Sequence, residues 1–211
     1  MKKLAENHKS ILSRVIETGL KIWIREKCNH IKKLDLEIIG SNLELLSGQI
    51  SKIKVSAAQI NFQDLELDKA EIFSHQINIL INPIKRNINL NKEFTVEGTI
   101  SINSKNIRNI LFASKWLWLS EFISIKLLGL SNLNSLKIEN NKLNINSYLS
   151  HDKKTLRSSS CEISAKDGKL IIADSSENKI VYIPIDKNIK VLEASIKNNI
   201  LIIKGEGIVT P

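Results

Sequence analysis

The chain has 211 residues, 42% of them hydrophobic, and a formal net charge of +9 at pH 7. With only 8 Gly and 3 Pro, this composition excludes a disordered or low-complexity protein and supports one domain, 1–211, with a sizeable core. The charge suits a polyanion, but only five of the 31 basic residues are Arg and 5% of the chain is aromatic, which disfavours nucleic acid relative to an anionic membrane surface.

The first residues are basic but lack the continuous apolar segment of a secretion signal. The most apolar run, Trp116 to Ile125, is too short to span a bilayer. We therefore expect a cytoplasmic protein that is peripheral to a membrane. Cys28 and Cys161 have no metal-ligand spacing around them and are expected to be reduced thiols.

Residues 9–27 carry apolar side chains at spacings of three and four, which predicts an amphipathic helix. Its apolar positions are Ile11, Leu12, Val15, Ile16, Leu20 and Trp23. The pattern fits a helix packed on a sheet and also a helix lying on a membrane surface.

Alternation of apolar and polar side chains predicts a first strand at Leu34–Ile38. After a connection at Ser41–Gly48, a longer alternating run without Gly or Pro extends from Gln49 to Ile81. Its alternation shifts near Ala57 and again after Phe62. We interpret these shifts as bulges or turns that would bend a large sheet.

A break is expected at Asn82-Pro83, because Pro cannot donate to a sheet ladder. The next strand is predicted at Phe94–Ile102, and Ser104 is the expected N-cap of a short helix at 106–112. The following segment, 115–128, fits a helix and a strand equally well.

Segment 115–128 contains two of the three Trp residues. If it is partly exposed, Trp116, Trp118 and Phe122 beside lysines would suit a membrane interface. The competing interpretation places these rings in the core, because a chain with few aromatics needs them there.

From Leu136 onward, three alternating segments are interrupted by residue pairs that accept the backbone of tight hairpins. These pairs are Asn140-Asn141, Asp167-Gly168 and Asn198-Asn199. They predict an antiparallel meander over the C-terminal third of the chain.

No pattern in the sequence indicates catalysis. The four His residues are scattered without metal-binding spacing, so no metal or cofactor is predicted. Ser158-Ser159-Ser160 lacks the flanking glycines of a hydrolase nucleophile and is expected to be a solvated strand end. Gly205-Glu206-Gly207 is not followed by a helix that could bind a pyrophosphate. We therefore expect a protein that is not an enzyme.

Residues Leu45–Ile50 resemble the "leucine pair, x, glycine, x, isoleucine" signature of the LmeA-like phospholipid-binding family, which is common in cyanobacteria and actinobacteria. The resemblance extends from about Leu34 to Ile203. The other matching segments are Ile53–Ala57, Leu65–Leu67, Phe94–Ile102 and the helix at 106–112. The resemblance implies an α+β fold in which a highly curved antiparallel β-sheet is wrapped around the N-terminal amphipathic helix, similar to tubular lipid-binding domains.

The leading hypothesis is a non-enzymatic peripheral protein that binds, and could transfer, phospholipid or glycolipid, with acyl chains in an apolar groove. The expected groove-lining residues are Leu12, Val15, Ile16, Leu20 and Trp23 of the helix and Ile60, Phe62, Phe94, Val96 and Ile100 of the strands. The expected membrane contacts are Trp116, Trp118 and Phe122. The alternative is a structural or interaction domain with a fully packed core, which docks a protein partner through a strand edge or through segment 116–122.

Overall fold

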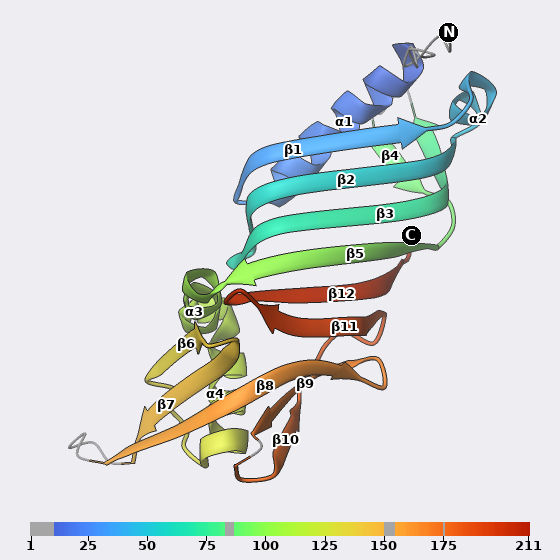
Figure 1. The fold of residues 1–211 in the computed structure, drawn as a ribbon. Helices are drawn as coiled ribbons and strands as arrows, with labels where there is room; N and C mark the ends of the chain where they lie inside the picture. Colours follow the sequence, from blue (N-terminus) through green and yellow to red (C-terminus); the bar gives the residue numbers. More distant parts are fainter. Residues whose placement is uncertain (1–10, 83–86, 150–154, 175) are drawn as a thin grey trace, which may run out of the picture.

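The structure, a computed structural model, describes residues 11–82, 87–149, 155–174 and 176–211. Over these residues the fold is α+β, with twelve strands paired in two antiparallel sheets, four α-helices and one 3-10 helix (Figure 1). The break predicted at Pro83 lies outside the described residues. No helix in the described ranges is long and apolar enough to cross a membrane.

The large sheet has the strand order β1-β2-β3-β5-β12-β11, and β4 pairs with the far end of β3. Its strands are β1 (His30–Ile39), β2 (Gln49–Phe62), β3 (Leu65–Asn82), β4 (Asn87–Leu90), β5 (Phe94–Asn103), β11 (Ile189–Lys197) and β12 (Ile200–Val209). A two-residue turn at Gln63-Asp64, with φ of 50° and 67°, joins β2 to β3. The alternation shift after Phe62 is therefore a hairpin turn.

The register of these strands separates the two faces of the large sheet by chemistry. One row across the sheet consists of Leu36, Val55, Ile72, Gly98, Gly205 and Val191. The adjacent row, on the opposite face, consists of Glu37, Lys54, Phe73, Glu97, Glu206 and Lys190. Because neighbouring residues of a strand point to opposite sides, one face is apolar and the other is charged. We call the apolar side the inner face.

The shift of alternation near Ala57 has a local cause in β2. Gln59 has a φ of 52°, and the pairing of β2 with both neighbours keeps one register on either side of it. Ala57 and Ile60 are therefore both buried although they are three residues apart. A single residue in the left-handed region rotates the strand without inserting the extra residue of a bulge.

Helix α1 (Ile11–Lys27) packs against the inner face beside the edge strand β1. Ile16, 5% exposed, lies in a cluster with Leu36 and Ile38. The carboxylate of Glu17 accepts the backbone N–H of Ile38 at 3.0 Å. This bond satisfies a donor on the open edge of β1, which would otherwise be available to another strand.

The connection Ser41–Gly48 contains a second helix, α2 (Asn42–Leu46), which the sequence did not reveal. Ser41 and Glu44 form a capping box at its N-terminus. Gly48 follows it with a φ of 77°, and a Cβ added there would lie 2.1 Å from the carbonyl oxygen of Ile79. Only glycine fits this position, where Gly48 O also accepts the N–H of Ile79 at 2.8 Å.

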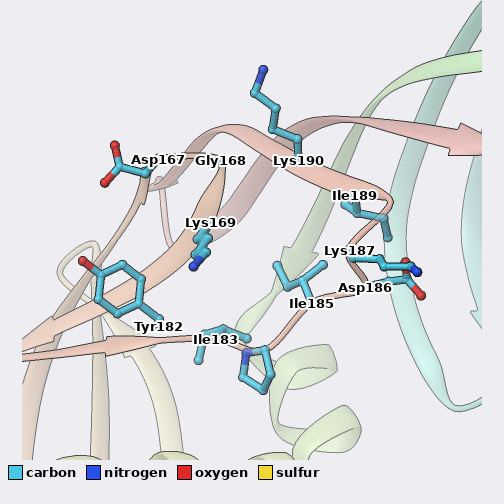
Figure 2. A pocket seen from close by; sticks show the side chains of 11 residues that line it. Asp167, Gly168, Lys169, Tyr182, Ile183, Ile185, Asp186, Lys187, Ile189 and Lys190 are labelled. Carbon is cyan, nitrogen blue, oxygen red and sulfur yellow. The ribbon is translucent and has the colours of Figure 1, made fainter.

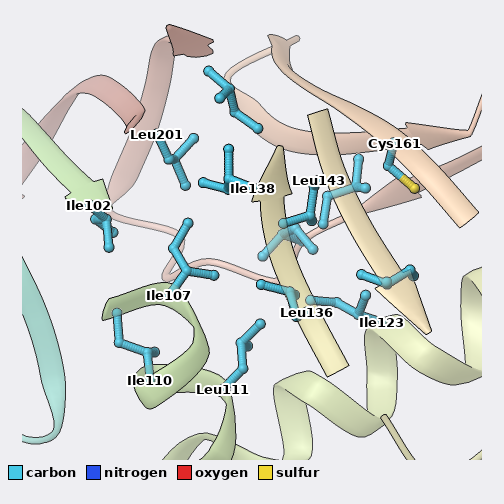
Figure 3. Packing of buried hydrophobic residues seen from close by; sticks show 14 of the residues in the cluster. Ile102, Ile107, Ile110, Leu111, Ile123, Leu136, Ile138, Leu143, Cys161 and Leu201 are labelled. Atoms are coloured by element: carbon cyan, nitrogen blue, oxygen red, sulfur yellow. The ribbon is translucent and has the colours of Figure 1, made fainter. Parts of the chain in front are cut away.

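The second sheet has the order β10-β9-β8-β7-β6 and is packed against helices α3 and α4. Its elements are α3 (Ser104–Phe112), the 3-10 helix η1 (Ser114–Trp116), α4 (Leu117–Leu128), β6 (Ser135–Glu139), β7 (Lys142–Tyr148), β8 (Leu156–Lys166), β9 (Lys169–Asp174) and β10 (Lys179–Tyr182). Figure 3 shows the core of this part, where side chains from α3, α4, β6 and β7 meet Ile102 and Leu201 at the end of the large sheet.

One open alternative is decided here, and two local expectations are corrected. Segment 115–128 is helical, and the N-cap of α3 is Asn103, whose side chain accepts the N–H of Asn106, rather than Ser104. The three hairpin turns are present with positive φ. The continuous C-terminal meander is wrong, however, because β11 and β12 leave the second sheet and β12 pairs with β5.

Candidate functional site

The centre of the inner face carries apolar side chains that are only partly covered. We call Val55, Ile72, Val96, Ile100 and Ile203 the apolar strip: each is half-buried, apart from Ile72, which is 36% exposed. The strip spans four adjacent strands, since β2, β3, β5 and β12 pair in that order. An apolar surface of this kind, left between covered regions, is suited to an apolar ligand.

Two packed clusters bound the apolar strip along the strands. On one side, Ile16 of α1 and Leu45 of α2 form a cluster with the start of β2 and the end of β3, which lie away from the β2–β3 turn. On the other side, the helices α3 and α4 complete the main core (Figure 3). Val55 touches both clusters. The strip therefore lies where neither helical layer covers the sheet fully.

The central row of the strip is the cross-strand row that runs from Val55 through Ile72, and its next two positions, on β5 and β12, are the glycines Gly98 and Gly205. A Cβ added at Gly98 would lie 3.5 Å from Glu71 O and 3.7 Å from Ile72 Cγ1, which are ordinary contacts. The backbone at position 98 would therefore accept a side chain, and the glycine found there leaves space over the inner face. Gly205 differs, because a Cβ there would lie 2.8 Å from the carbonyl oxygen of Lys190. That close approach accompanies the bulge between Val191 and Glu193.

A half-open pocket of about 510 Å³ lies at the β11 edge of the large sheet (Figure 2). Its lining residues are Asp167, Gly168, Lys169, Tyr182, Ile183, Pro184, Ile185, Asp186, Lys187, Ile189 and Lys190. Ile189 pairs with Gly207, which in turn pairs with Val96 of the apolar strip. Its lining combines apolar with charged side chains.

The lysines of this pocket are partly engaged with other groups. Lys190 Nζ lies 3.0 Å from Glu206 Oε1, and Figure 2 shows its side chain directed away from Ile183 and Ile185. Lys169 Nζ lies 5.8 Å from the centre of the Tyr182 ring. Of the three lysines that line the pocket, Lys190 is therefore paired with Glu206 and Lys169 lies near the Tyr182 ring.

The helical residues predicted to line a groove occupy two sides of α1. Ile16 is buried, and Leu12 and Leu20 pack against the same cluster at the inner face. Val15 and Trp23 are 63% and 56% exposed. Three of the five predicted residues therefore pack together against the inner face of the sheet, and the other two are exposed at the surface of α1.

The strand residues predicted to line a groove are also divided. Val96 and Ile100 belong to the apolar strip, whereas Ile60 is buried in the main core. Phe94 packs against the α1 cluster, and Phe62 is 41% exposed beside the β2–β3 turn. Val55, Ile72 and Ile203 were missed, because only the cross-strand register places them beside Val96 and Ile100.

The predicted membrane contacts lie at the start of α4. Trp118 is 48% exposed, next to Leu117 at 43%. Trp116 is half-buried, and its Nε1 donates to the carbonyl oxygen of Gln63 at 3.1 Å. Phe122 is half-buried against the main core. Of the three aromatic rings, that of Trp118 is therefore the most available at the surface.

A buried polar cluster joins β8 to the residues after β9. Asp174, 1% exposed, accepts hydrogen bonds from Ser159 Oγ and from the Oγ (2.6 Å) and backbone N–H (2.8 Å) of Ser176. Burial raises the pKa of Asp174, but these hydrogen bonds and one from the N–H of Glu177 outweigh it and lower the pKa to about 2. The expectation of a solvated strand end at Ser158–Ser160 is wrong, because Ser159 is 7% exposed.

This cluster has the character of a structural element. Cys161 is fully buried, and burial raises the pKa of its thiol, so the reactive thiolate is disfavoured. Ser159 Oγ lies 3.0 Å from Cys161 Sγ and donates to Asp174. Among the described residues, no group of His, Cys, Asp or Glu side chains could hold a metal ion.

Comparison with known protein families identifies the class of this protein. The sequence model of the LmeA-like phospholipid-binding proteins matches residues 9–147, about two thirds of the chain. The chain belongs to the LmeA-like phospholipid-binding family. The match begins before α1, earlier than the resemblance seen in the sequence, and ends within β7. No curated protein and no solved structure matches the chain.

The limits of the family match divide the candidate site. The apolar strip lies within the matched region except for Ile203, and all of the pocket beside β11 lies beyond it. The glycine of the family signature, Gly48, is the position where the backbone of β3 approaches too closely for any other residue. Membership therefore supports lipid binding as the function of the sheet and helices, while the pocket is a feature of this chain's C-terminal part.

Proposed function

We propose that this chain is a non-enzymatic phospholipid-binding protein, with residues 1–211 acting as one domain, which holds acyl chains on the apolar strip. The partly covered apolar strip on the inner face, in a chain of a phospholipid-binding family, is the observation that carries the proposal. The inner face and α1 would enclose the acyl chains between them, in the manner of tubular lipid-binding domains. Each methylene of an acyl chain that leaves water contributes roughly 0.8 kcal/mol, so the strip needs no charged group to hold it.

Of the residues predicted from the sequence, Val96 and Ile100 would contact the acyl chains directly. Leu12, Ile16 and Leu20 would support them from α1, because these side chains pack at the inner face. Glycolipid is a second ligand of the same chemistry, and transfer between membranes is a use that the same binding would allow. Location at the cytoplasmic face of a membrane stays a prediction.

The proposed partner surface is an anionic membrane rather than nucleic acid. Trp118, beside Leu117, would contact the interfacial layer, where tryptophan rings are favoured. The same exposed pair would also suit a protein partner, which is the second candidate function: an interaction domain whose core is fully packed. In that case the apolar strip would be empty of lipid in the purified protein.

The test is the lipid content of the purified protein. Native mass spectrometry, together with organic extraction and identification of the extracted lipids, should show one or a few phospholipids per chain. Protein that is purified without lipid and takes up none from added phospholipid would refute the proposal. Gly98→Leu and Thr99→Leu, on opposite faces of β5, supply a matched pair of variants for this measurement.

A further inference from the structure

Helix α1 is apolar on the side that faces away from the sheet as well as on the side that contacts it. Ile11, Val15 and Ile22 are 82%, 63% and 55% exposed. Their spacings of four and seven residues place them on one stripe of the helix. Ile16, on the opposite side, is buried against the sheet. A helix with two apolar sides needs a second apolar environment for the outer one.

Helix α2 adds two more exposed apolar side chains beside the start of α1. Leu45 is fully buried and fixes α2 to the core, while Leu43 and Leu46 are 80% and 71% exposed. The two helices contact each other, and Figure 1 shows α2 next to the first turns of α1. We call Ile11, Val15, Leu43 and Leu46 the α1–α2 tip.

The charge around the tip identifies the kind of surface that would cover it. The charged residues of α1 are Arg14, Lys21, Arg25 and Lys27 against Glu17 and Glu26. Glu17 is buried and accepts the N–H of Ile38 of β1. Glu44 of α2 is partly exposed, and its hydrogen bonds with Ser41 lower the pKa of its carboxyl group, so it is one negative charge beside Leu43 and Leu46. Among the exposed charged side chains of α1, Arg14, Arg25 and Lys27 are cationic and Glu26 is anionic, so the apolar stripe of this helix has a cationic excess beside it. Cationic groups beside exposed aliphatic side chains are complementary to a bilayer that contains anionic lipid.

We propose that the α1–α2 tip docks onto an anionic phospholipid bilayer, with Leu43 and Leu46 inserted among the lipids. The inference rests on the proposed function for the identity of the surface. The tip and Trp118 lie at opposite ends of the strands, because α2 follows the end of β1 while Trp116 contacts the β2–β3 turn. Along the 14 residues of β2 this separation is about 45 Å, so separate variants can test the two surfaces.

The decisive variant is the double substitution Leu43→Asp, Leu46→Asp in the full chain. Both side chains are exposed, so the thermal midpoint of unfolding should stay close to that of the wild type. Ile180→Asp is the matched control, because Ile180 is 53% exposed on β10, far from the tip. Binding is measured by co-flotation with vesicles of phosphatidylglycerol and phosphatidylcholine in equal parts. Pure phosphatidylcholine vesicles give the contribution of the anionic lipid.

We expect the double variant to bind the mixed vesicles about 100-fold more weakly, since each buried leucine contributes about a factor of ten or more. Ile180→Asp should bind as the wild type does, and the wild type should bind phosphatidylcholine alone more weakly. Binding of the double variant equal to that of the wild type would overturn the inference. If Trp118→Ala loses binding while the double variant keeps it, the membrane contact lies at the Trp118 end of the molecule and the inference is likewise overturned. Unchanged lipid content of the double variant, measured by extraction, separates failed docking from failure of the proposed function.

Discussion

The substitution Gly98→Leu offers the sharpest test of acyl-chain binding on the inner face. Gly98 sits in β5 beside Ile72, in the central row of the apolar strip. Its Cβ would meet nothing closer than 3.5 Å, so a side chain is tolerated and would extend over the strip. Because glycine in a strand costs roughly 0.5–1 kcal/mol in conformational entropy, the variant should be slightly more stable than the wild type.

The same substitution should weaken lipid binding, because leucine fills space that the acyl chain would use. The four carbon atoms of the new side chain displace about three or four methylenes. At roughly 0.8 kcal/mol for each, the loss is about 3 kcal/mol, or roughly 100-fold in affinity. A gain in stability together with a loss of binding is the signature that a merely damaged protein would not show.

The assay compares Gly98→Leu with Thr99→Leu, the next residue of β5, on the outer face. Each variant is purified, its phospholipid content is determined by extraction, and its affinity for a fluorescent phospholipid is titrated. Thr99→Leu should retain the wild-type lipid content. Full lipid content and unchanged affinity in Gly98→Leu would show that the acyl chains do not cross the central row of the strip.

Two further predictions concern stability. Gly48→Ala should lower the free energy of unfolding by about 2 kcal/mol or more, because φ at this position is 77° and the new Cβ would collide with the carbonyl oxygen of Ile79. Gly98→Ala is the control, because Gly98 has a negative φ. An unchanged denaturant midpoint for Gly48→Ala would contradict this prediction. Asp174 has its folded pKa lowered from 3.8 to about 2, so it should contribute roughly 2 kcal/mol above pH 4 that is lost as the pH falls towards 2. Denaturant titrations between pH 2 and pH 6 should show this loss, and Asp174→Asn should lack it.

Local signals in the sequence predicted the elements whose cause is local. The hairpin at Asn198-Asn199 follows from residues that accept positive φ, and alternation alone predicted a strand at Phe94–Ile102, which the structure has as Phe94–Asn103. The helix from 42 to 46 was missed, because its five residues hold too few apolar positions for a period. The type of segment 115–128 stayed open, since its apolar residues surround the helix rather than forming one stripe.

The sequence by itself determined that the chain is β-rich, resembles the LmeA-like family around Gly48 and has an apolar-striped helix before its first strand. Only the tertiary structure decided that β12 returns to pair with β5, which places Ile203 beside Ile100 and completes the apolar strip. It also decided that Val15 and Leu46 face outward while Ile16 and Leu45 are buried. The physical reason is that alternation and helical period assign side chains to faces, whereas pairing between distant segments decides which faces are covered.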